Sequence, residues 1–279
     1  MLVSASIQNG DLTKAGAGTL TLTGANTYAA TTISAGKLQI GDGGTTGTLG
    51  SGAVTDHGTL EFQRSNAYTV GNVISGTGAV MQSGSGTTTL TATNTFTGAT
   101  TISAGTLEAA GAASLGTTSS VAITSGGTLL LSGTGDQVNG SAAVTLDGGT
   151  IRSTIDGLNE TMGMLTLSGN STIDFGGFAA GNTFRFADSS AATWGSAILS
   201  IWNWTPTIDH LYFGTTNTAL TSSQLSKISF YSDGGSTLSN GSFGGAFNGT
   251  PFDGVNGGGR GARVLDDYIL GTLLQGFKN

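Results

Sequence analysis

The feature of this sequence that most limits its fold is an internal repeat about 68 residues long. Residues 18–36 read GTLTLTGANTYAATTISAG and residues 86–105 read GTTTLTATNTFTGATTISAG. With Ala99 treated as an insertion, 13 of the 19 positions are identical. The likeness continues where VTDHGTL at 54–60 stands against ITSGGTL at 123–129. Repetition at a fixed period indicates structural units that stack on their neighbours.

A shorter period lies inside the long one. A glycine followed two residues later by an apolar residue recurs along the chain, mostly at intervals of 18 to 22 residues, at Gly18, Gly36, Gly58, Gly78, Gly105, Gly127 and Gly149. About 20 residues is the length of one coil of a solenoid built from short strands and turns. The long repeat is then expected to hold three coils, in two copies at 14–80 and 82–151.

Side-chain alternation predicts that each coil consists of β-strands. Residues 19–23 read Thr-Leu-Thr-Leu-Thr, which places leucine on one face of a strand and threonine on the other. No Asn-Gly or Asp-Gly turn sits between two alternating runs of the repeat, so hairpins are not favoured. We therefore predict an all-β, right-handed parallel β-helix (a β-solenoid). The residues expected to fill and shape the repeat are Leu20, Leu22, Asn26, Tyr28, Ile33, Gly36, Leu38, Leu60, Leu90, Asn94, Phe96, Ile102, Gly105, Leu107 and Leu129.

The regular pattern extends over residues 1–175, which would give about eight coils. Residues 176–279 are expected to continue as less regular β coils that end in a cap or assembly segment. Within this part, Gln224 to Ile228 predicts a short helical turn, and Val264 to Leu274 has enough apolar residues to dock on the body or on a neighbouring molecule.

The composition excludes several kinds of partner. The chain has 49 glycines, 9% charged residues and a net charge of −7, and such an acidic surface repels nucleic acid. It has no cysteine, so disulfides and thiolate metal sites are excluded. No apolar run approaches the 18 residues of a membrane span, and no signal peptide is visible at the first residues.

The repeat resembles a known family. The stretch from Gly18 to Tyr28, followed by Thr-Thr-Ile-Ser-Ala-Gly-Lys-Leu up to Leu38, is similar to the autotransporter-associated β-strand repeat, also called the passenger-associated transport repeat. Copies lie at 14–41 and 82–108. The resemblance implies a secreted or cell-surface bacterial protein with a parallel β-helical passenger and an adhesive or structural role. It supplies no catalytic residue.

The C-terminal part resembles the closing segment of repeat proteins that are sorted by exosortase (PEP-CTERM) signals. The resemblance rests on residues 199–204, 209–214 and 220–230. The Pro-Glu-Pro motif, the terminal membrane helix and the basic tail of that pattern are missing from the sequence. The sequence therefore does not predict anchoring by that route.

The sequence offers no clear chemical site. His57 is expected to be a solvated turn residue, and Asp209 and His210 are adjacent, so on a strand they would point to opposite faces. Carboxylates are scattered, whereas polysaccharide-active β-helix enzymes need a cluster of them. Asp42 lies in a Gly-rich stretch, 41–44, that lacks the tandem pattern of calcium-binding nonapeptides, as does 253–259. We predict no catalytic, cofactor or metal site and no enzymatic activity.

Two surface features remain as alternatives. Trp194, Trp202 and Trp204 form either a cap over the end of the core or a sugar-stacking surface, with Trp202 and Trp204 expected on one face of a strand. Thr19 and Thr21 suggest the Thr-x-Thr array of ice-binding solenoids, but the motif recurs only every third coil in the expected register.

The sequence therefore predicts an extracellular structural protein, a subunit of a bacterial surface layer, matrix or filament. Open coil ends would expose unpaired strand edges, so we predict a homo-oligomer or head-to-tail filament. The alternative is an adhesin-type passenger or stalk that binds glycans or surfaces, and a polysaccharide-active enzyme is the third reading.

Overall fold

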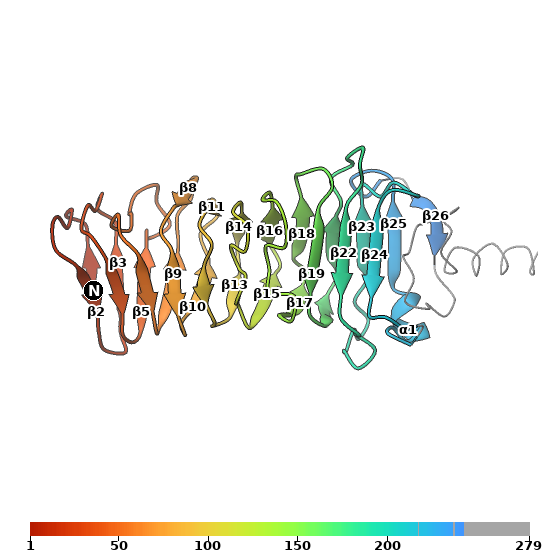
Figure 1. Ribbon diagram of the computed structural model, residues 1–279, viewed down its shortest axis with the longest axis horizontal. Helices are drawn as coiled ribbons and strands as arrows, with labels where there is room; N and C mark the ends of the chain where they lie inside the picture. The colour runs from red at the N-terminus through yellow and green to blue at the C-terminus, as the bar shows by residue number, and fades with distance from the viewer. Residues whose placement is uncertain (217, 237, 243–279) are drawn as a thin grey trace, which may run out of the picture.

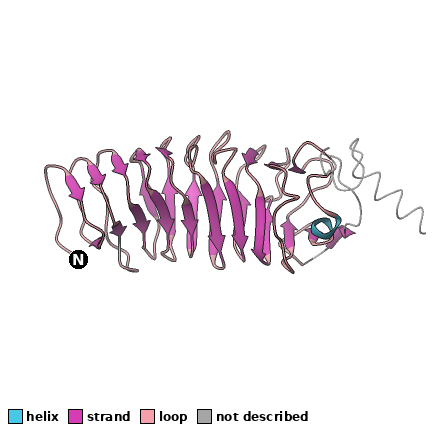
Figure 2. Cartoon of the chain, turned by 90° about the horizontal axis from the view of Figure 1, so that it is seen from below, coloured by secondary structure: helices cyan, strands magenta, loops and turns pink. Residues whose placement is uncertain are grey.

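The chain forms an elongated stack of short strands that runs from the N-terminal coil at one end to α1 and β26 at the other (Figure 1). The computed structural model describes residues 1–216, 218–236 and 238–242, and all structural statements concern these residues. Seen from below, the strands again lie side by side along the long axis, and the single helical turn lies near the far end (Figure 2).

Four sheets form the sides of the stack, and each is named here by its first and last strands. The β1–β20 sheet contains, in order, β1 (Leu2–Val3), β3 (Thr19–Leu22), β5 (Lys37–Ile40), β7 (Thr59–Phe62), β10 (Ala79–Gln82), β13 (Thr100–Ile102), β15 (Ser120–Thr124), β17 (Ala143–Asp147) and β20 (Leu165–Gly169). The β8–β26 sheet contains β8 (Tyr68–Val70), β11 (Thr87–Leu90), β14 (Gly105–Ala109), β16 (Gly127–Leu131), β18 (Thr150–Ser153), β21 (Ser171–Asp174), β23 (Leu199–Trp202), β25 (Ile228–Tyr231) and β26 (Leu238–Ser242).

Two shorter sheets share the third side. The β2–β12 sheet covers the N-terminal part with β2 (Leu12–Lys14), β4 (Thr31–Ile33), β6 (Val54–Asp56), β9 (Ile74–Gly76) and β12 (Thr95–Phe96). The β19–β24 sheet covers the C-terminal part with β19 (Asn159–Met162), β22 (Thr183–Phe186) and β24 (His210–Phe213). Between them, Leu115 and Val138 form an isolated parallel bridge.

Each coil pairs with the next coil in parallel, which confirms the predicted all-β solenoid. Leu38 on β5 is paired with Leu60 on β7, and Leu60 is paired with Val80 on β10. The nine strands of the β1–β20 sheet correspond to about eight turns, as the period predicted. The pairing of β25 with β26 is antiparallel, the one exception among the described strand pairs.

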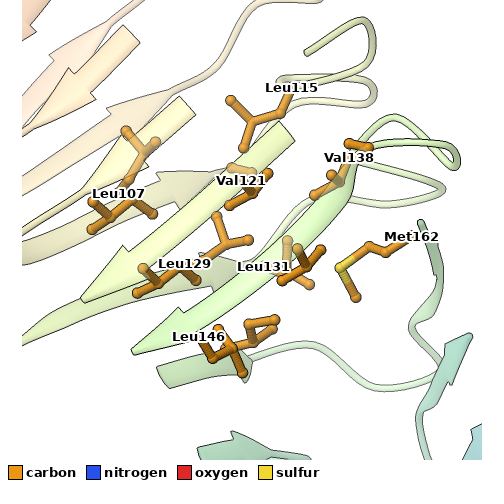
Figure 3. Close-up of a cluster of buried hydrophobic side chains, with 14 of the residues drawn as sticks. Leu107, Leu115, Val121, Leu129, Leu131, Val138, Leu146 and Met162 are labelled. Atoms are coloured by element: carbon orange, nitrogen blue, oxygen red, sulfur yellow. The ribbon is translucent and has the colours of Figure 1, made fainter. Parts of the chain in front are cut away.

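Inward side chains form a continuous buried column, because every second residue of a strand points into the solenoid. Figure 3 shows Leu129 and Leu131 of β16 packed with residues from neighbouring strands and bridges, among them Leu107, Val121 and Leu146. Most of the predicted core side chains are fully buried, namely Leu22, Tyr28, Ile33, Leu38, Leu60, Leu90, Phe96, Ile102, Leu107 and Leu129. Leu20 is only partly buried and packs against the edge of this core.

The long sequence repeat and the coil are out of phase. β3 belongs to the β1–β20 sheet, whereas its sequence counterpart β11 belongs to the β8–β26 sheet. Likewise β4 lies in the β2–β12 sheet, and its counterpart β13 lies in the β1–β20 sheet. The repeat therefore spans three coils plus one further side, which differs from the three whole coils expected from the offset.

The coils become longer toward the C-terminal end. Leu199 on β23 is paired with Ile228 on β25, a much larger sequence step than the one from Thr128 to Thr150. The helical turn predicted at 224–228 is present slightly earlier, as α1 (Ser222–Leu225), which begins with a capping box between Thr221 and Gln224. The segment Val264 to Leu274 lies outside the described residues.

Candidate functional site

Asn26 and Asn94, which occupy the same position in the two copies of the repeat, each link three successive coils. The Asn26 side-chain oxygen accepts a hydrogen bond from the Ile7 amide at 2.8 Å, and its nitrogen donates to the Thr48 carbonyl at 2.7 Å. Both asparagines are buried, so these bonds satisfy backbone groups that lie between strands. Their role is to hold the corners of the coil.

The turns that precede the repeated strands are held by a buried cation or amide. The Lys14 ammonium donates to the carbonyls of Ala15, Gly16 and Ala35 at 2.7 to 3.0 Å. At the matching position of the second repeat, the Gln82 amide donates to the carbonyls of Gly84 and Gly86. Both side chains are buried and close a turn, so neither is available for a ligand.

The predicted repeat glycines occupy a backbone conformation that other residues rarely adopt. Gly36 has a φ of 70° and Gly105 a φ of 58°. A Cβ on Gly36 would collide with the carbonyl oxygens of Gly16 and Gly18, and a Cβ on Gly105 would meet those of the matching turn in the second repeat. The close approach of the preceding coil therefore requires a glycine at both positions.

Among the described residues, three carboxylates have no exposed surface, and backbone amides bind each of them. Glu160 accepts hydrogen bonds from the amides of Gln137 and Val138 at 2.8 to 3.1 Å. Asp209 accepts from the amides of Asn182 and Thr205 at 2.8 and 2.7 Å. Burial is the main cause that raises the pKa of Glu160 to about 8 and that of Asp209 to about 6.

Asp56 is the third of these fully buried carboxylates. One of its oxygens accepts a hydrogen bond from the Gly58 amide at 2.8 Å, and burial raises its pKa to about 6. The three carboxylates come from different coils of the stack. None is joined to another by a hydrogen bond among the described residues, so they do not form an acid–base pair.

The two histidines are separated. His57 is exposed beside the β2–β12 sheet, where its Nδ1 lies 3.2 Å from the Thr77 hydroxyl. His210 begins β24, next to the buried Asp209, and its ring centroid lies 6.1 Å from that of Tyr212. In the described part of the chain, no group of three His, Asp or Glu side chains is placed to hold a metal ion. The Gly-rich stretch 253–259 lies outside that part.

The tryptophans fall into two classes. Trp194 and Trp204 are buried: the Trp194 indole donates to the Leu165 carbonyl at 3.0 Å, and Trp204 packs edge-on against Phe175 and Phe230. Trp202 is only partly buried. The expectation that Trp202 and Trp204 share a face is wrong, because β23 ends at Trp202 and Asn203 has a φ of 53°. This left-handed residue breaks the alternation and turns Trp204 into the core.

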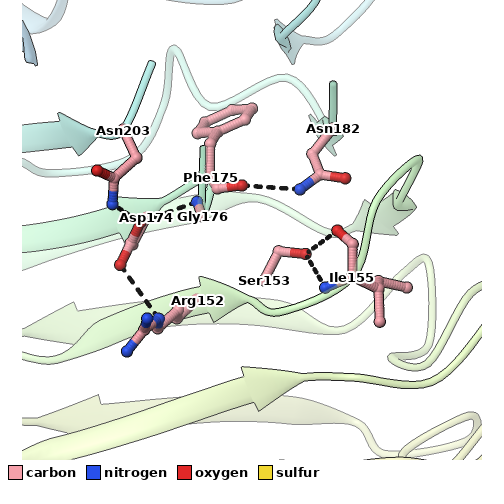
Figure 4. Close-up of polar contacts among 8 residues, drawn as sticks. All are labelled: Arg152, Ser153, Ile155, Asp174, Phe175, Gly176, Asn182 and Asn203. Atoms are coloured by element: carbon pink, nitrogen blue, oxygen red, sulfur yellow. Dashed lines mark hydrogen bonds and ion pairs between the residues drawn. The ribbon is translucent and has the colours of Figure 1, made fainter. Parts of the chain in front are cut away.

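Trp202 stands on the outer face of the β8–β26 sheet beside an ion pair. The strand pairing places Arg152 next to Asp174, and Asp174 next to Trp202, on consecutive coils. The Arg152 Nε lies 3.3 Å from an Asp174 oxygen. The other Asp174 oxygen accepts from the Gly176 amide at 2.9 Å and from the Asn203 side chain at 2.6 Å (Figure 4).

A hydroxyl ladder runs beside this ion pair, and it was missed in the sequence. Its members are paired directly from coil to coil and are Thr87, Thr106, Thr128, Thr150, Thr172, Ser200 and Ser229. The recurring threonine after glycine at 105–106, 127–128 and 149–150 was its signal. The phase shift between repeat and coil hid the ladder, because its threonines come from different positions of the long repeat. A ladder of Thr19-x-Thr21 motifs is not formed, since Thr19 is paired with Lys37 and Thr21 with Gln39.

No helix among the described residues has the length and the apolar character needed to cross a membrane.

Comparison with known proteins agrees with the repeat found in the sequence. The Brucella suis protein "Adhesin BmaC autotransporter" is 50% identical to this chain over 62 residues, which are 22% of this chain and 2% of the length of that adhesin. No solved structure matches the chain. Residues 12–40 and 82–109 match the model of the passenger-associated-transport-repeat. The chain is thus a β-solenoid that carries two passenger-associated transport repeats.

Proposed function

We propose that this chain is a secreted or cell-surface β-helical passenger segment with a structural role, which acts as a stiff spacer. The repeat type and the adhesin relative both support this placement. The relative shares only a small part of its length with this chain, so its binding properties are not transferred.

The uninterrupted buried column carries the proposal. On the β8–β26 sheet the inward residues follow one another by direct pairing over six coils, namely Leu107, Leu129, Ile151, Ile173, Ile201 and Phe230. All six are buried. A column of this kind resists bending because each coil is packed against both neighbours. A solenoid of eight coil steps would span about 40 Å at the usual strand spacing.

The use of the buried acids supports a non-enzymatic role. Glu160 and Asp209 accept hydrogen bonds from backbone amides of a neighbouring coil, and Asp56 accepts one from the Gly58 amide within its own turn. A general acid or base must instead reach a substrate proton. These groups are employed in building the coil.

Protease treatment of intact cells tests the surface placement. Cells that produce the full-length protein are treated with proteinase K, and the repeat region is followed with an antibody. We expect the epitope to be lost from intact cells, while a cytoplasmic marker remains. Full protection of the epitope in intact cells, with digestion after lysis, would contradict the proposal.

We also propose that the chain self-associates through its first coil. Met1 and Leu2 are 84% and 60% exposed, and β1 and β2 are each paired on one side only among the described residues. Unpaired edges favour strand addition. At the other end, α1 lies beside the last coils and β26 is paired with β25, so we expect the first coil to make the contact.

Negative-stain microscopy and light scattering at increasing concentration test this contact. We expect oligomers of the wild type that are abolished by Leu2→Lys and retained in Val73→Lys, a matched variant since Val73 is 46% exposed on the side of the rod. Dispersed wild-type monomers at high concentration would contradict self-association through the first coil and would not affect the proposed spacer role.

The second candidate is an adhesin-type passenger. The partly exposed Trp202 favours it, because Trp194 and Trp204 are used inside the core.

A further inference from the structure

The outer face of the β8–β26 sheet near its C-terminal end combines an aromatic ring, an ion pair and hydroxyl groups. We define the Trp202 face as Arg152, Asp174, Trp202 and Tyr231 with the neighbouring Thr172 and Ser200. All six lie on four consecutive strands, β18, β21, β23 and β25. Outside this face and the hydroxyl ladder, the outward positions of β8, β11, β14 and β16 carry Thr69, Thr89, Glu108 and Leu130 and no aromatic ring.

The register sets the spacing of these groups. Arg152 is paired with Asp174, Asp174 with Trp202, and Thr172 with Ser200. Tyr231 follows Phe230, the partner of Ile201, and its partial exposure places it on the outer face one coil beyond Trp202. Neighbouring coils are about 4.8 Å apart, and residues two apart on a strand are about 6.6 Å apart. These distances suit a chain of sugar rings lying across the strands.

Asp174 organises the polar half of the face. Its side chain is only 9% exposed. It accepts hydrogen bonds from the Gly176 amide and the Asn203 side chain and forms an ion pair with Arg152. The Arg152 side chain keeps 51% of its surface exposed, although its Nε is held by the carboxylate. A guanidinium that is fixed at one edge and open at the other presents donors in a set orientation.

Trp202 is also fixed in orientation. A Cβ built on Gly235 would lie 2.7 Å from Trp202 Cε2, so the backbone of the loop after β25 rests against the indole. Gly235 has a φ of 101°, and its missing side chain permits this approach. The loop braces the ring and leaves part of it exposed. A braced, partly exposed indole loses little freedom when a ligand stacks on it.

We propose that the Trp202 face binds a neutral oligosaccharide. The inference deepens the adhesin-type candidate and rests on the proposed surface exposure of the chain. Aromatic rings pack against the apolar faces of sugar rings, while guanidinium and hydroxyl groups hydrogen-bond to sugar hydroxyls. The charges of Arg152 and Asp174 cancel, and the net charge of −7 disfavours polyanionic glycans. Neutral sugars meet no such repulsion.

Affinity electrophoresis of the purified full chain tests the proposal. Native gels are cast with laminarin, galactomannan or xylan as neutral polysaccharides and with alginate as an acidic one. We expect retardation by at least one neutral polysaccharide and about tenfold weaker binding by Trp202→Ala. The matched control is Tyr212→Ala, which removes an aromatic ring with an arginine 3.9 Å from its centroid on the β19–β24 sheet. This control is expected to bind like the wild type.

A second variant keeps the test decisive if Trp202→Ala disturbs the loop. Arg152→Gln preserves the stem of a half-exposed side chain and is expected to weaken binding severalfold with an unchanged melting temperature. The proposal is overturned if no neutral polysaccharide retards the wild type, if both variants bind like the wild type, or if alginate alone binds. Because purified protein is used, these outcomes are independent of the protease test on intact cells.

Discussion

Asn26 and Asn94 form the same two hydrogen bonds at different corners of the solenoid. Each side-chain oxygen accepts from a backbone amide of the preceding coil, Ile7 or Ile74, at 2.8 Å. Each side-chain nitrogen donates to a carbonyl of the following coil at 2.7 or 2.8 Å. Yet Asn26 follows a strand of the β1–β20 sheet, and Asn94 follows a strand of the β8–β26 sheet. The repeat therefore encodes a corner of the coil and leaves open which corner it occupies.

Replacing either asparagine by alanine should destabilise the fold similarly. Asn94→Ala leaves the Ile74 amide and the Ser114 carbonyl without their partner in a buried place, so we expect a loss of about 1–3 kcal/mol in the free energy of unfolding. Urea denaturation followed by circular dichroism measures the loss. The control is Asn159→Ala, an exposed asparagine whose removal should cost less than about 0.5 kcal/mol. Equal losses for the buried and the exposed replacement would refute the stabilising role of the asparagine hydrogen bonds at the corners.

Stability should decrease as the pH rises through neutrality. Burial raises the pKa of Glu160 from an ordinary 4.5 to about 8, so between these values the folded state binds a proton that the unfolded state has released. The contribution of Glu160 to the stability of the folded state is complete below about pH 4.5 and is lost as the pH rises through about 8. Asp56 and Asp209 act in the same direction up to about 6.

Glu160→Gln should flatten this dependence. The amide does not ionise, so the fall in melting temperature between pH 5 and pH 8 is expected to be smaller than in the wild type. Asp42→Asn, at an exposed turn, serves as the control and should retain the wild-type slope. A variant whose slope between pH 5 and pH 8 equals that of the wild type would show that Glu160 does not titrate there.

Alanine at the repeat glycines should be poorly tolerated. Gly36→Ala adds a methyl group against two carbonyl oxygens at a φ of 70°, and Gly105→Ala does the same in the second repeat. We expect each to lower the melting temperature by several degrees, since a loss of 1 kcal/mol shifts it by about 2–4 °C in a domain of this size. Gly18→Ala is the matched control because no atom lies within 4 Å of its added Cβ and its φ is not positive. A Gly36 variant as stable as the Gly18 variant would argue against the close approach of the coils.

Two adjacent leucines distinguish the inner from the outer face of a strand. Leu129 is fully buried, and Leu130 on the same strand is partly exposed. Leu129→Ala is expected to cost about 2–5 kcal/mol through the lost burial and the cavity, and Leu130→Ala about 1 kcal/mol or less. Denaturant titration of both variants provides the measurement. The reverse order of the two losses would place the strand with its faces exchanged.

The local structure of each coil could be predicted because it depends on near neighbours. Alternation in Thr19–Thr23 determined which leucines face inward, and the step of about 20 residues determined the partner strand of each segment. The helical turn near Gln224 was also within reach of the sequence, since a capping box is a local signal. The hydroxyl ladder required the register of every coil, which the sequence pattern alone did not provide.

The sequence by itself determined the period of the coil, its inward residues and the turns that require Gly36 and Gly105. Only the tertiary structure decided on which side of the solenoid each copy of the repeat lies, and that Trp202 faces outward while Trp204 enters the core. The first depends on the summed lengths of all preceding corners, and the second on the left-handed Asn203. Strand pairing and packing depend only on the neighbouring coils. The side of the solenoid on which a segment lies depends instead on the lengths of all the coils and corners before it.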